Sequence, residues 1–248
     1  SKENFKIGDN ITDRWVLSNL QTLKRTISEE MEAYRLYNVV PALFTFIEDL
    51  TNTYIRLNRG RFWSEGLSDD KCEAYSTLYT ALRELSISMA PFVPFFSEYI
   101  YQELKTLNSA NDEAESVHLC DYPVADDSKI NTILEDAVDR MNQIILLGRQ
   151  KRNQVKVKVK TPLRRLTVIH QDQALLDEIA LLEEYIKAEL NIKSIQYDQN
   201  EAAYINFFAK PNFPALGKRL GKEMGKYAGM MSKISEEQIA SFEESGSI

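Results

Sequence analysis

The spacing of apolar residues between Asn38 and Trp63 limits the fold of this chain more than any other feature. Apolar side chains recur there at steps of three and four residues: Val40, Leu43, Ile47, Leu50, Tyr54 and Leu57. That period places them on one face of an α-helix, which a folded domain buries against neighbouring helices. The stretch therefore predicts one member of a helical bundle.

Four other segments have the same helical period. Together with the first stretch, the predicted helices cover residues 12–37, 38–60, 68–91, 94–107 and 127–154. Thr12, Asn38 and Ser68 are of the residue types that cap helix starts, and Gly60 is placed to end the second helix. The stripe of the first helix is Val16, Leu20, Leu23, Ile27, Met31 and Tyr34.

The apolar period changes from helical to alternating near Val155. Val155, Val157 and Val159 alternate with lysines, which is typical of a β-strand. Further strands are predicted at 165–170, 193–197 and 203–209, and a helix is marked by Leu175, Ile179, Leu182, Ile186 and Leu190. The fold class predicted is mainly α: an antiparallel helical bundle over residues 1–154, followed by a small α+β domain over residues 155–248.

Composition excludes several classes of protein. No run of 18 apolar residues exists in the 248, so no membrane span is expected, and the first ten residues do not resemble a secretory signal. Cys72 and Cys120 lack metal-ligand spacing and read as reduced thiols of a cytoplasmic protein, so we predict no metal site. His118 and His170 are isolated, and no catalytic motif is present, so we predict no catalytic residue.

The charges are unevenly distributed along the chain. A net charge of -7 argues against a protein that coats nucleic acid indiscriminately. However, residues 108–139 carry nine acids and one base, whereas residues 140–171 carry nine bases and no acid. Such asymmetry indicates a local site for a polyanion on an otherwise acidic molecule.

Two basic clusters are the candidate RNA-binding sites. The first lies at the end of the second predicted helix and joins Trp63, a residue able to stack on an unpaired base, to Arg56, Arg59 and Arg61. The second spans the end of the helix predicted over 127–154 and the strand predicted after it: Arg149, Arg152, Lys156, Lys158, Lys160, Arg164 and Arg165. The alternatives are a solvated helix end with Trp63 in the core, and a lysine-rich edge strand that prevents aggregation.

Glycines recur every four residues near the C-terminus, at Gly217, Gly221, Gly225 and Gly229. On a helix they would form one bare face. Either the segment is exposed and frayed, or its bare face approaches another backbone or a phosphate group. The sequence leaves both open.

Six segments resemble one family of proteins. ITDRWVLSNLQTL, MAPFVPFFSEYIYQEL and SVHLCDYP resemble motifs of the anticodon-binding bundle in class I tRNA synthetases. NVVPALFTFIEDLTNTYIRLNRGRFW is similar to a run in isoleucyl-tRNA synthetases. LGRQKRNQVKVKVKTPLRRLTVIH and AKPNFPALGKRLGKEM favour the isoleucyl over the valyl enzymes. The chain looks most like the type found in eukaryotic cytosol and in some bacteria.

The resemblance implies a C-terminal anticodon-binding region whose partner is the isoleucine tRNA, tRNA(Ile). The HIGH-like and KMSKS-like ATP-site motifs are absent, so the implied catalytic and editing domains lie upstream. ATP would be used there, no cofactor is expected here, and these residues alone should be inactive. Thr53 and Gly60 stand where relatives often carry Trp and Arg, which weakens the family argument for RNA contacts there. A protein-interaction module and the same region of a valine–tRNA ligase stay open as alternatives.

Overall fold

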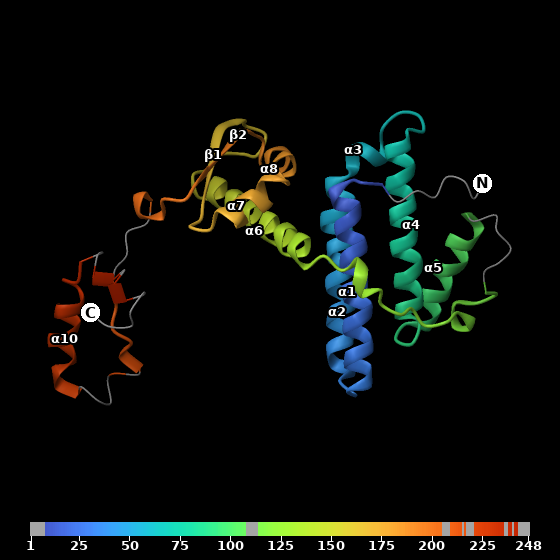
Figure 1. The fold of residues 1–248 in the computed structure, drawn as a ribbon, viewed down its shortest axis with the longest axis horizontal. Helices are drawn as coiled ribbons and strands as arrows, with labels where there is room; N and C mark the ends of the chain where they lie inside the picture. The colour runs from blue at the N-terminus through green and yellow to red at the C-terminus, as the bar shows by residue number, and fades with distance from the viewer. Residues whose placement is uncertain are drawn as a thin grey trace. The chain divides into compact units, whose positions relative to one another are not determined.

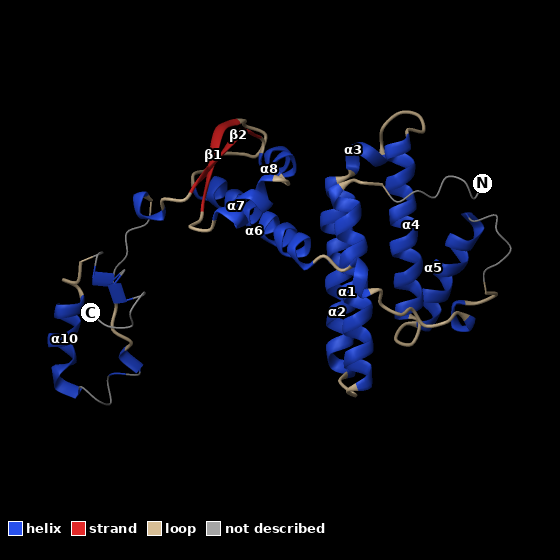
Figure 2. Ribbon diagram, viewed as in Figure 1, coloured by secondary structure: helices blue, strands red, loops and turns tan. Residues whose placement is uncertain are grey.

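The structure, a computed structural model, describes residues 8–107, 114–204, 209–214, 216, 221–235, 238–239 and 241–242. Helices dominate this part of the chain, and its only strands are β1 (Leu163–Ile169) and β2 (Ile192–Asp198), which pair with each other (Figures 1 and 2). Leu163 N donates to Asn191 O and His170 N to Asp198 O, a constant offset that marks the strands as parallel. The predicted fold class, mainly helical with a small α+β part, is confirmed.

The first helix, α1 (Ile11–Glu32), packs against α2 (Leu36–Glu48) and α4 (Asp69–Met89) (Figure 1). Its buried stripe includes Val16, Leu20, Leu23 and Ile27, as predicted. Asn10, not Thr12, caps the helix, because its Oδ1 accepts the N–H of Thr12 at 2.9 Å. Tyr34 does not continue the stripe. It lies in the turn before α2 with φ 58° and is 91% exposed.

The second helix differs from its predicted form. After α2 it continues as a π-helical segment, η2 (Asp49–Ile55), and resumes as α3 (Arg59–Phe62), so it does not end at Gly60. A π-helix bonds residue i to i+5 and so adds residues to the turn, which defeats a count of threes and fours. Leu43, Leu50 and Tyr54 are buried as predicted, but Val39 and Phe46 are buried as well, and Val40 is 39% exposed.

Helix α4 and the helix predicted from residue 94 begin within one residue of the predicted positions, but the helix predicted from residue 127 begins five residues later. Ser68 caps α4 through its Oγ, which accepts the N–H of Lys71 at 3.2 Å. Helix α5 (Pro94–Leu107) has the predicted bounds, and α6 (Thr132–Gln154) begins after the cap Asn131. Short 3-10 turns, η3 (Val117–Leu119) and η4 (Asp127–Lys129), lie between α5 and α6.

Helices α7 (Gln173–Ala180) and α8 (Glu183–Leu190) replace the single helix predicted from Leu175 to Leu190. One compact unit joins residues 1–163 to residues 177–193, and the second comprises residues 164–176 and 194–248. Within the first, α8 lies on α6 so closely that a Cβ at Gly148 would stand 2.5 Å from Cδ1 of Leu190. That two domains divide near Val155 stays a prediction.

Two expectations fall on the C-terminal part of the chain. The strand predicted over 203–209 falls largely on residues 205–208, outside the described residues, and the 3-10 turn η5 (Glu201–Ala203) precedes them. Further along the chain lie η6 (Gly221–Glu223) and α10 (Met224–Met231). Gly217 also lies outside the described residues, and a Cβ at Gly225 or Gly229 would meet open space within 4 Å.

Candidate nucleic-acid interface

A buried polar network joins the start of α1 to the end of the π-helical segment. Asn58 is 1% exposed, and its Nδ2 donates to Thr12 Oγ1 at 2.9 Å and to Tyr54 O at 2.8 Å. The Tyr54 hydroxyl donates to Asp13 Oδ1 at 2.7 Å. Burial, and after it the bond to Asp13, raise the pKa of Tyr54, so the hydroxyl stays a donor at neutral pH. The network therefore fixes the point at which α3 starts.

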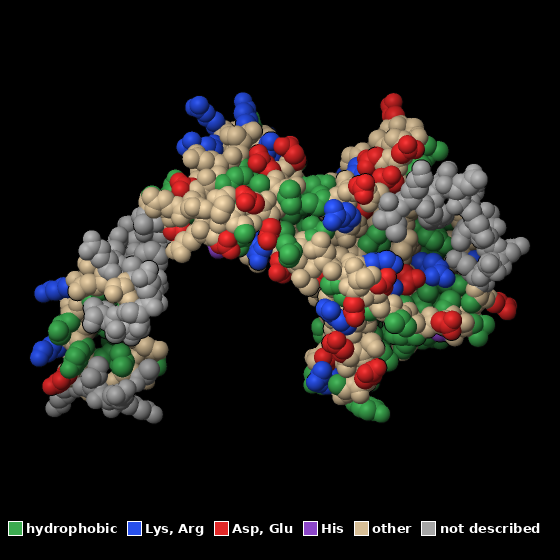
Figure 3. Space-filling view, viewed as in Figure 1, with side chains coloured by type: hydrophobic (Ala, Val, Ile, Leu, Met, Phe, Trp, Pro, Cys, Tyr) green, Lys and Arg blue, Asp and Glu red, His purple; other side chains and the backbone are tan. Residues whose placement is uncertain are grey.

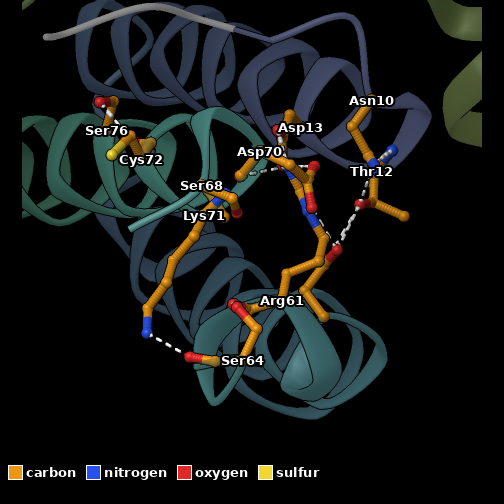
Figure 4. Close-up of polar contacts among 12 residues, drawn as sticks. Asn10, Thr12, Asp13, Arg61, Ser64, Ser68, Asp70, Lys71, Cys72 and Ser76 are labelled. Carbon is orange, nitrogen blue, oxygen red and sulfur yellow. Dashed lines mark hydrogen bonds and ion pairs between the residues drawn. The ribbon is translucent and has the colours of Figure 1, made fainter. Parts of the chain in front are cut away.

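Arg61 lies at the centre of this network (Figure 4). Its Nη1 and Nη2 donate to the two carboxylate oxygens of Asp13, both at 2.8 Å. Nε donates to Asp70 Oδ1, and the remaining N–H groups donate to Asn58 Oδ1 and Asp70 O. Burial opposes the charge, but the bonds to Asp13 and Asp70 raise the pKa of Arg61. All five donors of the guanidinium are used, so none is left for a phosphate group.

The backbone on either side of Trp63 is anchored to α4. Phe62 is 7% exposed and meets the rings of Tyr54 and Tyr75 edge to face, with centroids at 6.0 and 5.3 Å. On the other side, Lys71 Nζ donates to Ser64 O at 2.7 Å (Figure 4). We call Arg61–Ser64 the Trp63 ledge, because three of its four residues are held by these contacts.

Trp63 itself is exposed over 70% of its surface. This excludes the alternative in which Trp63 belongs to the core. A large exposed aromatic ring on a fixed backbone can stack on an unpaired base without ordering the chain first. The ledge therefore has the form of a stacking platform.

Two of the predicted arginines share one carboxylate. Glu189 of α8 accepts a short hydrogen bond from Arg149 Nη2, and its Oε2 lies 3.6 Å from Arg56 Nε. This shared carboxylate ties α6 and Arg56, which directly follows η2, to α8, and the three residues together keep one net positive charge. Arg59 is exposed and has no ion-pair partner in the part of the chain that the structure describes. Of the three arginines, Arg59 is therefore the most available to phosphate.

The segment from Val155 to Thr161, here called the lysine loop, is not a strand. It consists of turns, and Lys156 adopts a left-handed φ of 56°. The predicted strand is wrong because the alternating valines do not form a buried face: Val155 is 56% and Val159 41% exposed. A strand with no partner strand and no buried face gains nothing over a turn.

The buried side chain of Arg152 is hydrogen-bonded to the backbone of the lysine loop. It is 3% exposed, and its Nη1 donates to the carbonyls of Lys158 and Thr161, at 3.1 and 3.0 Å. Its Nη2 donates to Leu190 O at 2.6 Å and Asn191 O at 3.3 Å, at the C-terminal end of α8. Buried and bonded in this way, Arg152 does not face solvent.

The three lysines of the loop do face solvent. Lys156, Lys158 and Lys160 are exposed, and none has an ion-pair partner among the described residues. Arg164 and Arg165 are also exposed, on β1 in the second compact unit. Figure 3 shows Lys and Arg side chains projecting around β1 and β2. The exposed cations can therefore bind a polyanion.

Reasoning from the sequence missed the partners of the predicted site residues. Asp13 is fully buried beneath Arg61, Asn191 holds the carbonyl of Val159 at 3.0 Å, and Glu189 holds Arg149. Asp13 lies in the first turn of α1, and nothing in the local pattern connects it to Arg61, 48 positions away.

Neither a metal-binding cluster nor a membrane-spanning helix is found among the described residues. Among the described residues no group of three or more His, Cys, Asp or Glu could hold a metal ion. No helix in the same part of the chain is long and apolar enough to cross a bilayer.

Comparison with known proteins identifies the family. A model of the anticodon-binding domain of tRNA ligase matches residues 13–169. The chain is 44% identical to the isoleucine–tRNA ligase of Bdellovibrio bacteriovorus over 99% of its length, and 42% identical to the cytoplasmic isoleucine–tRNA ligase of Arabidopsis thaliana over 96%. The cytoplasmic isoleucine–tRNA ligase of Saccharomyces cerevisiae is 38% identical over 97%.

The matched regions make up 23%, 20% and 23% of these three relatives, so the chain spans about a fifth of their length. The predicted family is confirmed. This chain belongs to the anticodon-binding domain family of tRNA ligases, and it corresponds to that region of the isoleucine–tRNA ligases over nearly its whole length.

Proposed function

We propose that this chain binds the anticodon stem and loop of tRNA(Ile) and so positions that tRNA for aminoacylation by other domains of a longer protein. The observation that carries the proposal is the lysine loop: three exposed lysines without acidic partners among the described residues, on a backbone held by Arg152. Cations presented in this way bind the phosphates of a nucleic acid and release its counterions. The names of the relatives support isoleucine as the amino acid.

In this proposal the RNA is bound by two kinds of contact, ionic contacts to phosphates and stacking on a base. The loop lysines, with Arg59, Arg164 and Arg165, bind phosphates, which hold the RNA without reading its sequence. Trp63 stacks on an unpaired base of the loop, because sequence-specific RNA recognition usually engages unstacked bases. Arg56 and Arg149 are already paired with Glu189, so they add less to the affinity than their charge implies.

Binding of tRNA(Ile) transcript at several salt concentrations tests this function. The logarithm of affinity should fall linearly as the logarithm of salt concentration rises, with a slope of roughly 0.7–0.9 per phosphate contact. Valine tRNA is the matched competitor, and it should displace tRNA(Ile) poorly. Tighter binding of valine tRNA would favour the valine–tRNA ligase alternative, and no salt-dependent RNA binding would favour a protein-interaction module.

The catalytic and editing domains and ATP belong to the longer cytoplasmic protein in this proposal. These 248 residues should therefore not activate isoleucine, because they lack the ATP-site motifs. The measurement is isoleucine-dependent exchange of pyrophosphate into ATP. Exchange above background from a homogeneous preparation would contradict the proposal.

A further inference from the structure

We propose that Arg152 is a positioning residue: it acts on RNA through the lysine loop and does not itself contact RNA. This inference rests on the proposed function, because it assigns a role to a residue beneath the proposed phosphate-binding lysines. It also changes the expectation from the sequence, in which Arg152 was one of the cations that contact RNA.

The bonds of Arg152 leave its charge directed inward. The guanidinium is bonded to four backbone carbonyls, two in the loop at Lys158 and Thr161 and two at the end of α8. With 3% of the residue exposed, a phosphate group reaches it only if the loop moves away. Carbonyl oxygens at a helix C-terminus carry partial negative charge, so they compensate the buried cation where no carboxylate does.

Asn191 holds the loop from the side. It adopts a left-handed φ of 49°, ends α8, and donates from Nδ2 to Val159 O at 3.0 Å. Three backbone carbonyls of the loop, those of Lys158, Val159 and Thr161, are therefore bound to side chains outside it. Arg152 O also accepts the N–H of Val157 at 2.9 Å. The loop backbone is fixed, and only its lysine side chains extend into solvent.

Fixing the backbone has a direct effect on binding. Three lysines within five residues repel one another, so a free loop would spread them apart and would have to be ordered when RNA binds. A neutral side chain at position 152 cannot replace these hydrogen bonds, because only a guanidinium offers enough planar donors for four carbonyls. The loop is thus arranged for phosphate before RNA arrives.

The experiment compares Arg152→Gln and Asn191→Gly with the wild-type chain in binding to tRNA(Ile) transcript. Glycine adopts the left-handed conformation of residue 191 freely, so Asn191→Gly removes one bond to the loop without changing any charge. We expect about tenfold weaker binding for Arg152→Gln and about threefold weaker for Asn191→Gly, from the added cost of ordering the loop. The salt slope should be unchanged in both variants.

Cleavage by trypsin after Lys156, Lys158 and Lys160, located by mass spectrometry, reports directly on the loop. Both variants should be cleaved there faster than the wild type while the rest of the chain resists. If Arg152 contacts a phosphate itself, Arg152→Gln instead reduces the slope by about 0.7–0.9 and the loop stays resistant, which overturns the proposal. Unchanged affinity in both variants also overturns it.

Two controls keep the result interpretable. A thermal melt shows whether Arg152→Gln is folded, and if it is not, Asn191→Gly decides alone. Replacing Lys156, Lys158 and Lys160 together with Gln tests the loop as a binding site. If that triple variant binds like the wild type, the proposed function of the loop fails. If the triple variant binds weakly while Arg152→Gln and Asn191→Gly both bind like the wild type, only the proposed role of Arg152 fails.

Discussion

The Trp63 ledge and the lysine loop both depend on an arginine that is hydrogen-bonded inside the fold, but the partners of the two arginines differ in charge. Each combines exposed side chains with an arginine that is bonded inside the fold: the half-buried Arg61 near Trp63, and the buried Arg152 near the loop lysines. Arg61 is neutralised by the carboxylates of Asp13 and Asp70, whereas the guanidinium of Arg152 is bonded to backbone carbonyls. The ledge therefore presents an apolar ring beside a guanidinium whose charge is compensated by carboxylates, and the loop keeps all of its positive charge.

This difference fits two ligand chemistries. A base that stacks is uncharged and gains from a large rigid ring, while a phosphate backbone gains from uncompensated cations. The partners of each arginine therefore decide its effect. Carboxylates compensate the charge of Arg61, whereas carbonyls leave the net charge of Arg152 in place. Four variants test the comparison, here in order from the largest expected effect on stability or binding to the smallest effect on stability.

Asp13→Asn should have the largest effect. Asp13 is fully buried and accepts from both Arg61 and Tyr54, so its loss leaves a guanidinium partly uncompensated inside the protein. Breaking a buried ion pair in this way costs about 3–5 kcal/mol of unfolding free energy. Urea unfolding measures it. The matched control is Asp70→Asn, whose carboxylate is 55% exposed and which should cost under about 1 kcal/mol. Equal losses in the two variants would show that Asp13 does not carry the ledge.

Trp63→Ala should change binding and leave stability nearly intact. The loss of stacking should weaken affinity for the tRNA(Ile) transcript by about 1–3 kcal/mol, with no change in salt slope. Trp63→Phe is the control and should retain most of the affinity. Iodide quenching of tryptophan fluorescence checks the geometry, because Trp63 is 70% and Trp15 1% exposed, so bound RNA should protect the accessible fraction. A fall in salt slope in Trp63→Ala would mean that the ledge also orders phosphate contacts.

Asp49→Asn removes a pH effect that would confuse the comparison. Burial raises the pKa of Asp49 to about 6, opposed by a hydrogen bond from Asn19 and reinforced by Asp139 and Glu48. Because the folded-state pKa is raised, the folded chain holds a proton that the unfolded chain has lost between about pH 4 and 6, and stability falls as pH rises through that window. Allowing for partial solvation, the loss is about 1–2 kcal/mol.

Urea unfolding at pH 4 and at pH 7 measures this effect. The amide introduced by Asp49→Asn still accepts the bond from Asn19 and carries no charge, so the variant should be more stable than wild type at pH 7 and nearly equal to it at pH 4. A variant as pH-dependent as the wild type would place the titrating group elsewhere.

The triple variant of Lys156, Lys158 and Lys160 with Gln should have the smallest effect on stability. The three side chains are exposed and unpaired among the described residues, so each should change the unfolding free energy by no more than about 0.5 kcal/mol. The salt slope of tRNA binding should nevertheless fall by about 0.7–0.9 for each lysine that pairs with a phosphate in the wild type. A destabilisation of several kcal/mol would mean that the lysines support the loop themselves.

Local pattern predicted most of the helices, because a helical face is a property of residues three and four apart. It located the Ser68 cap, the bounds of α5, and both strands of the sheet to within two residues. It failed at the π-helical segment η2, where the spacing rule changes, and at the lysine loop. Alternation there did not make a strand, since a strand needs a partner and a buried face.

The sequence by itself determined the fold class, the family and the concentration of basic residues after Arg140. Only the tertiary structure decided which of the chain's arginines are free to bind a ligand. Arg61 and Arg152 look like Arg59 in the sequence, yet their donors are used by Asp13 and by the end of α8, which lie 48 and 38 positions away. The physical reason is that a hydrogen bond is settled by distance in space. A buried guanidinium takes every acceptor that the fold brings within reach, and no periodicity along the chain records that choice.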